Sequence, residues 1–369
     1  MTRLLSRSAS ILAAALLAGP IWLGCTDQTG EPTAPAEPQL SLSIPIDQDV
    51  FAAAIAAQER RTEHLLSVPG VVGTAVGLSG SGRPAVKVYV ETADLAGLPR
   101  KIDGVPVVVE VTGEIFALQE AKRCENPPNC KGGNGGGGGA DDPPVDRTAR
   151  FDRPVPIGVS TGHPDITAGT IGARVIKGAN VYALSNNHVY AKSNTASIGD
   201  AVIQPGTFDG GSSPADDIGT LSDFEPINFS GGNNVIDAAI AASSPALLGN
   251  ATPSDGYGTP RSTTKVASIN LRVMKYGRTT GQTKGRITGI NATVNVFYGS
   301  PGVARFVNQI VIGGGGFSAG GDSGSLIVVQ KGEDQGKPVG LLFAGSSSVT
   351  IANPIDAVLT RFGVTIDGL

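Results

Sequence analysis

Histidine, cysteine and aromatic side chains are scarce in this chain, and the scarcity of the first two argues against a metal site. The 369 residues include three histidines and three cysteines, and aromatic side chains make up 5%. Ligands that are so few do not suggest a zinc centre, and we expect neither a metal nor a cofactor. The net charge is −4 and no basic run is long, so we also expect no nucleic-acid partner.

Glycine, by contrast, is abundant. There are 52 glycines, and hydrophobic residues make up 40% of the chain. This composition favours a buried core built with many turns over one built from long helices. The length leaves room for two or three domains.

Residues 1–25 have the pattern of an export signal. Arg3 and Arg7 form a positively charged start, and an apolar run over 11–17 follows. The tripeptide that ends at Cys25 resembles the lipobox of bacterial lipoproteins, in which the cysteine is lipidated. Residues 26–39 are rich in Pro, Thr and Glu and indicate a disordered tether. We expect a protein of the cell envelope anchored in the membrane through Cys25, with plain secretion as the alternative.

Cys124 and Cys130 lie at the start of a linker over 121–150. They bracket a short proline-kinked loop, and an exported chain permits a disulfide there. Zinc would need more ligands than these two thiolates. The glycine-rich remainder of the linker cannot bury enough apolar surface to fold. A local disulfide between Cys124 and Cys130 is therefore the preferred interpretation.

Residues 40–120 are predicted to form a small α+β domain. A helix capped near Asp47 and Asp49 runs through 51–66 and ends before a Pro-Gly pair. Runs of β-prone residues follow, separated by Gly-rich turns. They cover residues 71–78, 85–90 and 105–111.

From residue 151 to the end the chain is predicted to be all β. Short β-prone runs alternate with Gly, Asn, Asp, Ser and Pro, and no long helical period competes with them. Evenly spaced short strands in a segment of this length suit a pair of barrels or sandwiches.

Three residues of this segment form the strongest chemical pattern. Ser323 lies in a glycine-rich turn, GGDSGS, over 320–325. His188 closes a β-prone run at a polar Asn-Asn corner, and Asp237 begins another run with apolar flanks. Acyl transfer by a serine needs a base for its proton, an acid that orients the base, and donors for the oxyanion. Glycine-flanked Ser323 can also present backbone N–H groups to such an oxyanion.

The rivals for these roles are weaker. His163 lies in a turn before a proline and is interpreted as structural, and His64 lies on the predicted helix. Asp216 and Asp217 lie in a Gly/Ser/Pro loop without the apolar flank of Asp237.

The order of the three residues along the chain narrows the choice of fold. No histidine follows Ser323, which excludes the Ser…Asp…His order of α/β-hydrolases. Subtilisins use the order Asp…His…Ser within alternating strands and helices, a pattern that 151–369 lacks. The order His…Asp…Ser is that of chymotrypsin-type enzymes.

Residues 155–365 resemble the trypsin-like serine peptidases of bacterial, exported type. The matching segments are 185–189 (SNNHV), 236–240 (IDAAI), 320–325 (GGDSGS) and 339–345 (VGLLFAG). The resemblance implies two antiparallel β-barrels of chymotrypsin type, at about 155–250 and 262–365, within a peptidase domain over 151–369. It also implies hydrolysis of protein or peptide substrates.

The same resemblance assigns roles to residues. Ser323 would be the nucleophile, His188 the general base and Asp237 its partner, while the backbone N–H groups of Gly321 and Ser323 would form the oxyanion hole. The specificity pocket would be lined by Phe317, Phe343, Ala344 and Gly345, which favour a hydrophobic or small side chain.

One departure from the family pattern is present, and two alternatives remain open. No activation sequence precedes the barrels, so an N-terminal amine is not expected to pair with Asp322. Residues 40–120 are either a propeptide that assists folding or blocks the catalytic cleft, or an accessory or spacer domain. The alternative function for the whole chain is a cell-surface binding module on a peptidase scaffold that no longer cleaves.

Overall fold

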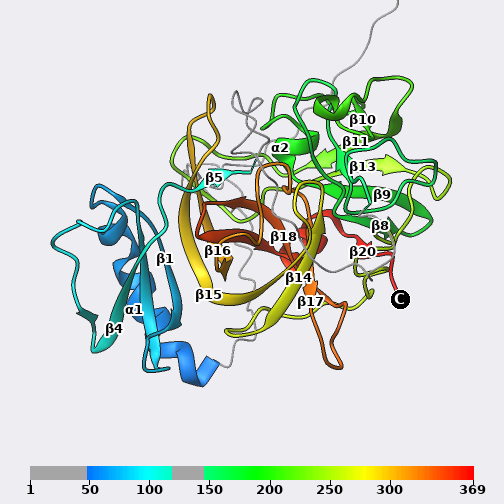
Figure 1. The fold of residues 1–369 in the computed structure, drawn as a ribbon. Coiled ribbons are helices and arrows are strands. Elements are labelled where there is room, and N and C mark those ends of the chain that lie inside the picture. The colour runs from blue at the N-terminus through cyan, green and yellow to red at the C-terminus, as the bar shows by residue number, and fades with distance from the viewer. Residues whose placement is uncertain (1–47, 119–144) are drawn as a thin grey trace, which may run out of the picture. The chain divides into compact units, whose positions relative to one another are not determined.

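The computed structural model describes residues 48–118 and 145–369, and strands dominate both ranges. The predicted mostly β class with a preceding α+β segment is confirmed. Two large sheets carry most of the core, and the N-terminal helix α1 (Gln48–Leu66) packs on strands that extend the larger one (Figure 1).

The smaller sheet holds six strands in the order β10-β11-β13-β9-β8-β20. Its strands are β8 (Ala173–Lys177), β9 (Asn180–Ser185), β10 (Ala201–Ile203), β11 (Asp217–Phe224), β13 (Ala239–Ser243) and β20 (Thr365–Ile366). All pairings are antiparallel. Apolar side chains such as Ala183, Leu221 and Ala239 form one buried cluster inside it.

The larger sheet begins with strands of the C-terminal half. They are β12 (Asn233–Asn234), β14 (Arg272–Gly277), β15 (Gly281–Phe297), β16 (Val303–Gly313), β17 (Leu326–Val329), β18 (Pro338–Gly345) and β19 (Val349–Pro354). They follow the order β12-β16-β19-β18-β17-β14-β15, and β15 pairs with β16 as well. The 17-residue strand β15 ends this series and also pairs with β16, next to the strand at its other end.

The N-terminal elements match the predicted ones closely. They are α1 (Gln48–Leu66), β1 (Val71–Leu78), β2 (Pro84–Val90), β3 (Lys101–Ile102) and β4 (Val105–Val111). Their sheet is not self-contained, because β1 pairs antiparallel with β15. At Gly73 a Cβ would lie 2.8 Å from the Val294 side chain, so glycine permits the close approach of the two strands.

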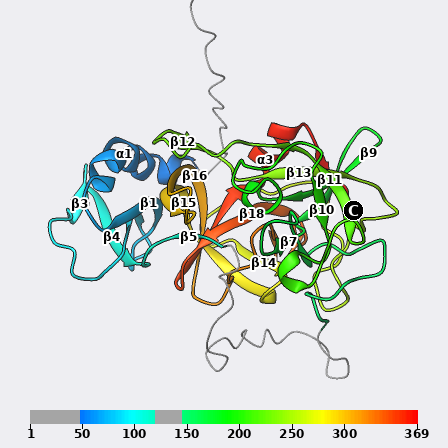
Figure 2. The ribbon, with the colours of Figure 1, turned by 90° about the horizontal axis from the view of Figure 1, so that it is seen from above.

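Short elements complete the chain (Figure 2). They are β5 (Phe116–Ala117), β6 (Ser160–Thr161), β7 (Gly169–Thr170), α2 (Asn187–Tyr190) and α3 (Ile355–Phe362). The strand β5 (cyan in Figure 1) leaves the N-terminal elements and pairs with both β15 and β18.

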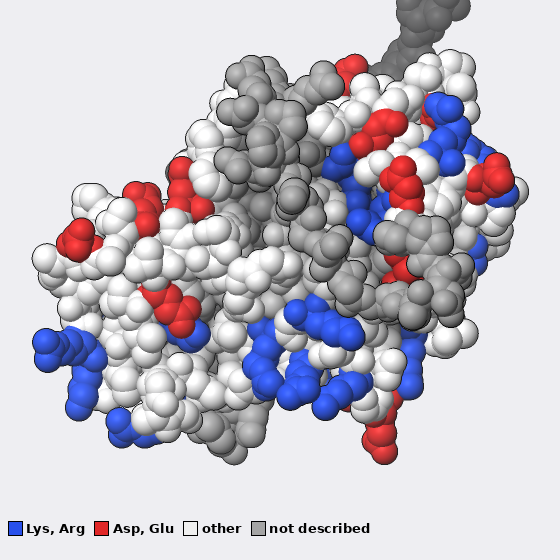
Figure 3. Space-filling model, in the orientation of Figure 1, with Lys and Arg blue, Asp and Glu red and all other residues white. Residues whose placement is uncertain are grey.

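The face in Figure 3 carries both signs of charge, with Lys and Arg gathered in its lower centre. No helix within the described ranges is long and apolar enough to span a membrane.

Candidate active site

His188 and Asp237 meet because β9 pairs with β13. Ser185 at the end of β9 lies opposite Ala239 at the start of β13, so the residues just beyond these strand ends are neighbours. His188 Nδ1 lies 2.5 Å from Asp237 Oδ2, and the His188 backbone N–H donates to Oδ1 at 3.2 Å. Both side chains are fully buried. The carboxylate therefore fixes the ring through Nδ1 and leaves Nε2 to face other groups.

Tyr298 is a third member of this group that sequence reasoning missed. Its hydroxyl donates to Asp237 Oδ2 at 2.8 Å, and its ring lies edge-on to His188 with centroids 5.9 Å apart. Burial, followed by the negative charge of Asp237, raises the pKa of Tyr298 well above its usual value. The phenol thus stays protonated as a donor. Its sequence position, at the end of an apolar run, indicated only a core residue.

Ser323 lies in a turn that β7 ties to the smaller sheet. Thr170 N–H donates to the Ser323 carbonyl and Ser185 Oγ donates to the Thr170 carbonyl, both at 2.8 Å. Gly324 has φ +95°, and a Cβ there would lie 2.3 Å from the Thr170 carbonyl oxygen, so this position requires glycine.

The Ser323 hydroxyl donates to the Phe343 carbonyl at 3.2 Å. His188 Nε2 is buried and has no hydrogen-bond partner among the described residues. An unpartnered buried ring nitrogen is costly in a purely structural role, and its acceptor capacity is what a general base requires.

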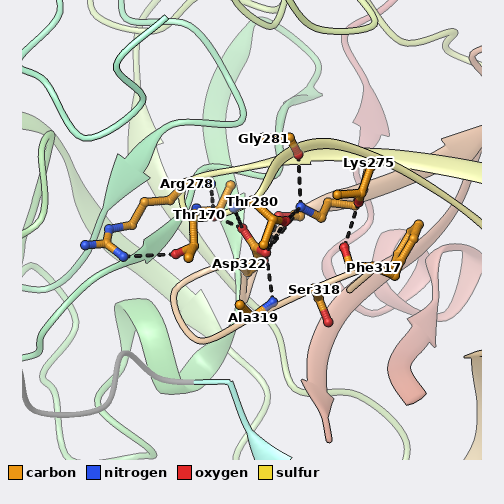
Figure 4. Close-up of polar contacts among 12 residues, drawn as sticks. Thr170, Lys275, Arg278, Thr280, Gly281, Phe317, Ser318, Ala319 and Asp322 are labelled. Atoms are coloured by element: carbon orange, nitrogen blue, oxygen red, sulfur yellow. Dashed lines mark hydrogen bonds and ion pairs between the residues drawn. The ribbon is translucent and has the colours of Figure 1, made fainter. Parts of the chain in front are cut away.

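Asp322, next to Ser323, is held by a buried lysine (Figure 4). Lys275 Nζ lies 3.2 Å from Asp322 Oδ2, and both side chains are inaccessible to solvent. The Thr279, Thr280 and Ala319 backbone N–H groups also donate to this carboxylate. Burial lowers the pKa of Lys275, and the charge of Asp322 opposes that shift. No N-terminal amine was expected to pair with Asp322. The structure places Lys275, on β14, as its cationic partner instead.

Two of the rival residues, His163 and Asp216, have other partners. His163 Nε2 lies 3.1 Å from Asp200, and Asp216 forms a two-point ion pair with Arg150. His64 is exposed on α1. These contacts tie His163 and Asp216 to other parts of the fold.

The predicted pocket residues lie in two different clusters. Phe317 packs in the cluster of Ile312 and Leu342, whereas the Phe343 ring and Ala344 pack in the cluster of Phe306. Phe343 thus contributes its backbone carbonyl to the site. Gly345 and Ala319 line an open groove beside the turn, with a volume of about 490 Å³.

The structure is comparable with several solved bacterial serine proteases. The chain resembles the trypsin-like serine peptidases. Thermobifida fusca Protease A is 19% identical with a TM-score of 0.43, over 58% of this chain and 100% of its own. For Cellulomonas bogoriensis chymotrypsin the values are 17% and 0.41, over 59% and 100%. For Nocardiopsis protease they are 16% and 0.42, over 57% and 99%.

Sequence comparison covers less of the chain. A family model described as the Nal1 C-terminal domain matches residues 262–352, which is less than half of the chain. No curated protein matches the sequence. The roles of the site residues therefore rest on the geometry above.

Several predictions fall on residues outside the described ranges. They include the export signal, the tether, lipidation at Cys25 and the Cys124–Cys130 disulfide, and they stay predictions. Within the described ranges, no group of three or more His, Cys, Asp or Glu side chains is arranged to hold a metal ion.

Proposed function

We propose that the protein is a serine endopeptidase that cleaves peptide bonds with Ser323, His188 and Asp237. The observation that carries this proposal is the buried His188–Asp237 hydrogen bond of 2.5 Å, which leaves Nε2 without a partner. Gly169 lies between this pair and the serine turn, because a Cβ there would lie 2.5 Å from the side chain of Val189, next to His188, and 3.1 Å from the Ser323 carbonyl oxygen. A second observation supports it, because the Gly321 N–H in that turn donates to a peptide carbonyl at 2.9 Å.

The Ser323 side chain must rotate before the reaction can begin, because its hydroxyl donates to the Phe343 carbonyl. Turning Ser323 about its Cα–Cβ bond exchanges the Phe343 carbonyl for His188 Nε2 as the acceptor. His188 then takes the hydroxyl proton as Ser323 Oγ attacks the substrate carbonyl carbon, and Asp237 stabilises the charged ring. The N–H groups of Gly321 and Ser323 stabilise the oxyanion.

The attack forms a tetrahedral intermediate, and two further steps complete the cycle. His188 returns the proton to the leaving amine, the C–N bond breaks, and an acyl-enzyme on Ser323 remains. Water then attacks the ester with His188 again as the base, which releases the carboxylic acid and restores Ser323.

Labelling with a fluorophosphonate tests the proposal directly. The purified full chain carrying Leu118→Asp is expected to gain one covalent label that peptide mass spectrometry places on Ser323, while the same chain with Ser323→Ala gains none. The wild-type chain is labelled in parallel and is expected to react more slowly, because Leu118 contacts the Gly321 N–H and obstructs the site. Absence of label from both chains would contradict the proposal and favour the non-catalytic binding module.

Tyr298→Phe is expected to lower kcat about 10- to 100-fold with little change in KM. The variant loses a hydrogen bond to the Asp237 carboxylate, and bonds to charged groups contribute about 1.5–3 kcal/mol. The Tyr298 side chain contacts His188 and Asp237, and Tyr298 lies outside β18, which supplies the Phe343 carbonyl, so substrate affinity should persist. Steady-state kinetics on a peptide substrate measures kcat and KM separately.

Tyr276→Phe is the matched control for Tyr298→Phe. It also removes a hydroxyl bonded to a carboxylate, that of Asp255, away from His188. Equal losses of kcat in the two variants would show that Tyr298 has no specific positioning role.

A further inference from the structure

The chain inserts one of its own strands beside Ser323. Leu118 directly follows β5, and its carbonyl accepts a hydrogen bond from Gly321 N–H at 2.9 Å. Its own N–H donates to the Phe343 carbonyl at 3.1 Å. Leu118 therefore has its carbonyl in the proposed oxyanion site and its amide on β18.

The residues before Leu118 are held on both edges. Ala117 lies opposite Ala344 and Phe116 opposite Gly345 in antiparallel pairing. On the other edge, Phe297 N–H donates to the Ile115 carbonyl at 2.9 Å. An added strand on a sheet edge, with successive side chains in pockets, is a common mode of peptide recognition. Residues 115–118 thus bind as a peptide substrate would.

The side chains of residues 115–118 occupy different environments. Leu118 packs against the cluster of Phe317, and one of its methyl carbons lies 3.4 Å from where a Cβ on Gly345 would be. Ile115 and Ala117 are buried in the cluster of the Phe343 ring. Phe116 is 42% exposed and its ring meets Phe297 edge-on. The site is thus filled by one leucine, one small residue and one buried aliphatic residue.

We propose that the protein cleaves its own chain at the peptide bond on the carboxyl side of Leu118. The proposal rests on the proposed function. Ser323 Oγ attacks the Leu118 carbonyl carbon, His188 moves the serine proton to the amine of residue 119, and the C–N bond breaks. Water hydrolyses the Leu118 ester, which leaves a carboxylate at Leu118 and a new α-amine.

After the cut, the N-terminal elements stay attached and inhibit the enzyme. The strand β1 remains paired with β15, and Glu63 remains bridged to Arg305 at 2.8 Å. Asn291 Nδ2 also donates to Gln58 Oε1 at 3.0 Å. These contacts lie outside the scissile bond, so they keep the local concentration of the product strand high. Activity on other substrates then requires removal of residues 48–118 from the site.

The same contacts define the substrate class. They select extended peptides with leucine before the cut, a small residue one place earlier and a buried aliphatic residue three places earlier. The sequence Ile-Phe-Ala-Leu of residues 115–118 is the model of such a substrate.

Intact-mass measurement of four purified full-length chains tests the cleavage. The chains are wild type, Ser323→Ala, Leu118→Asp and the control Val111→Asp. Leu118→Asp places a charge in the apolar site, whereas Val111→Asp adds the same charge at a 48% exposed position on β4. We expect wild type and Val111→Asp to yield a fragment that begins at Gln119, at a rate independent of protein concentration. Ser323→Ala and Leu118→Asp should keep that bond.

The fluorophosphonate label separates failure of this inference from failure of the function. Ser323 that labels in wild type or in Leu118→Asp, with wild type uncut after Leu118, overturns the inference and leaves the proposed function standing. Cleavage after Leu118 in Ser323→Ala also overturns it, since another protease would then be responsible. Neither label nor cleavage in any chain overturns both. The Ser323→Ala comparison decides the matter even where Leu118→Asp fails to fold.

Discussion

Ser323→Ala is expected to lower kcat for peptide hydrolysis by about a millionfold. His188→Ala should cost as much, and the double variant should lose no more than either alone, because nucleophile and base act as one unit. The residual rate comes from binding and from the Gly321 N–H group that holds the carbonyl.

The measurement uses a fluorogenic peptide ending in Ile-Phe-Ala-Leu, with each variant made in the Leu118→Asp chain, where the resident strand is weakened. Ser262→Ala is the matched control, since Ser262 is an exposed serine that bonds to the C-terminal carbonyl. Losses that multiply in the double variant would show that Ser323 and His188 act independently and would contradict the triad.

Lys275→Met is expected to lower the free energy of unfolding by about 3–5 kcal/mol. Removal of one partner from a buried ion pair leaves the other charge buried without compensation, here Asp322. The same carboxylate accepts hydrogen bonds from the N–H of Ala319, just before the Ser323 turn, and from that of Thr279, in the β14–β15 hairpin, so peptide hydrolysis should fall with stability. Denaturant unfolding of the full chain measures the first effect.

Lys265→Met is the control for this loss. Lys265 pairs with Asp334 at 2.7 Å, but its side chain is 42% exposed. Exposed pairs contribute about 0–1 kcal/mol, so the control should lose little. A loss for Lys275→Met no larger than that of the control would contradict a structural role for the buried pair.

Most strand positions could be predicted because their signals are local. The runs at 71–78 and 105–111 alternate with turn residues, and they are β1 and β4 in the structure. The helix α3 escaped prediction, because a helix of eight residues is too short for a clear helical period. The pairing of β1 with β15 also escaped, since strand propensity does not specify a distant partner.

The residues of the candidate site likewise divide into those that the sequence indicated and those that only tertiary contacts reveal. Ser323 and His188 stood out through glycine flanks and the scarcity of histidine, signals that a linear sequence carries. Tyr298 did not, because its only special feature is a contact with Asp237, 61 residues away. Lys275 lies in the hairpin of β14 and β15, whose sequence gives no sign of a buried charge, because its burial against Asp322 depends on how β14 packs beside the serine turn.

The sequence by itself determined the strand-rich class, the N-terminal helix and the serine, histidine and aspartate on which the chemistry is proposed to depend. Composition, periodicity and residue order encode these properties locally. Only the tertiary structure decided that Lys275 neutralises Asp322, that Tyr298 supports Asp237 and that Leu118 lies beside Ser323. Each of these contacts joins residues far apart in the chain, and it exists because pairing of the sheets brings specific strand ends together and excludes water from between them.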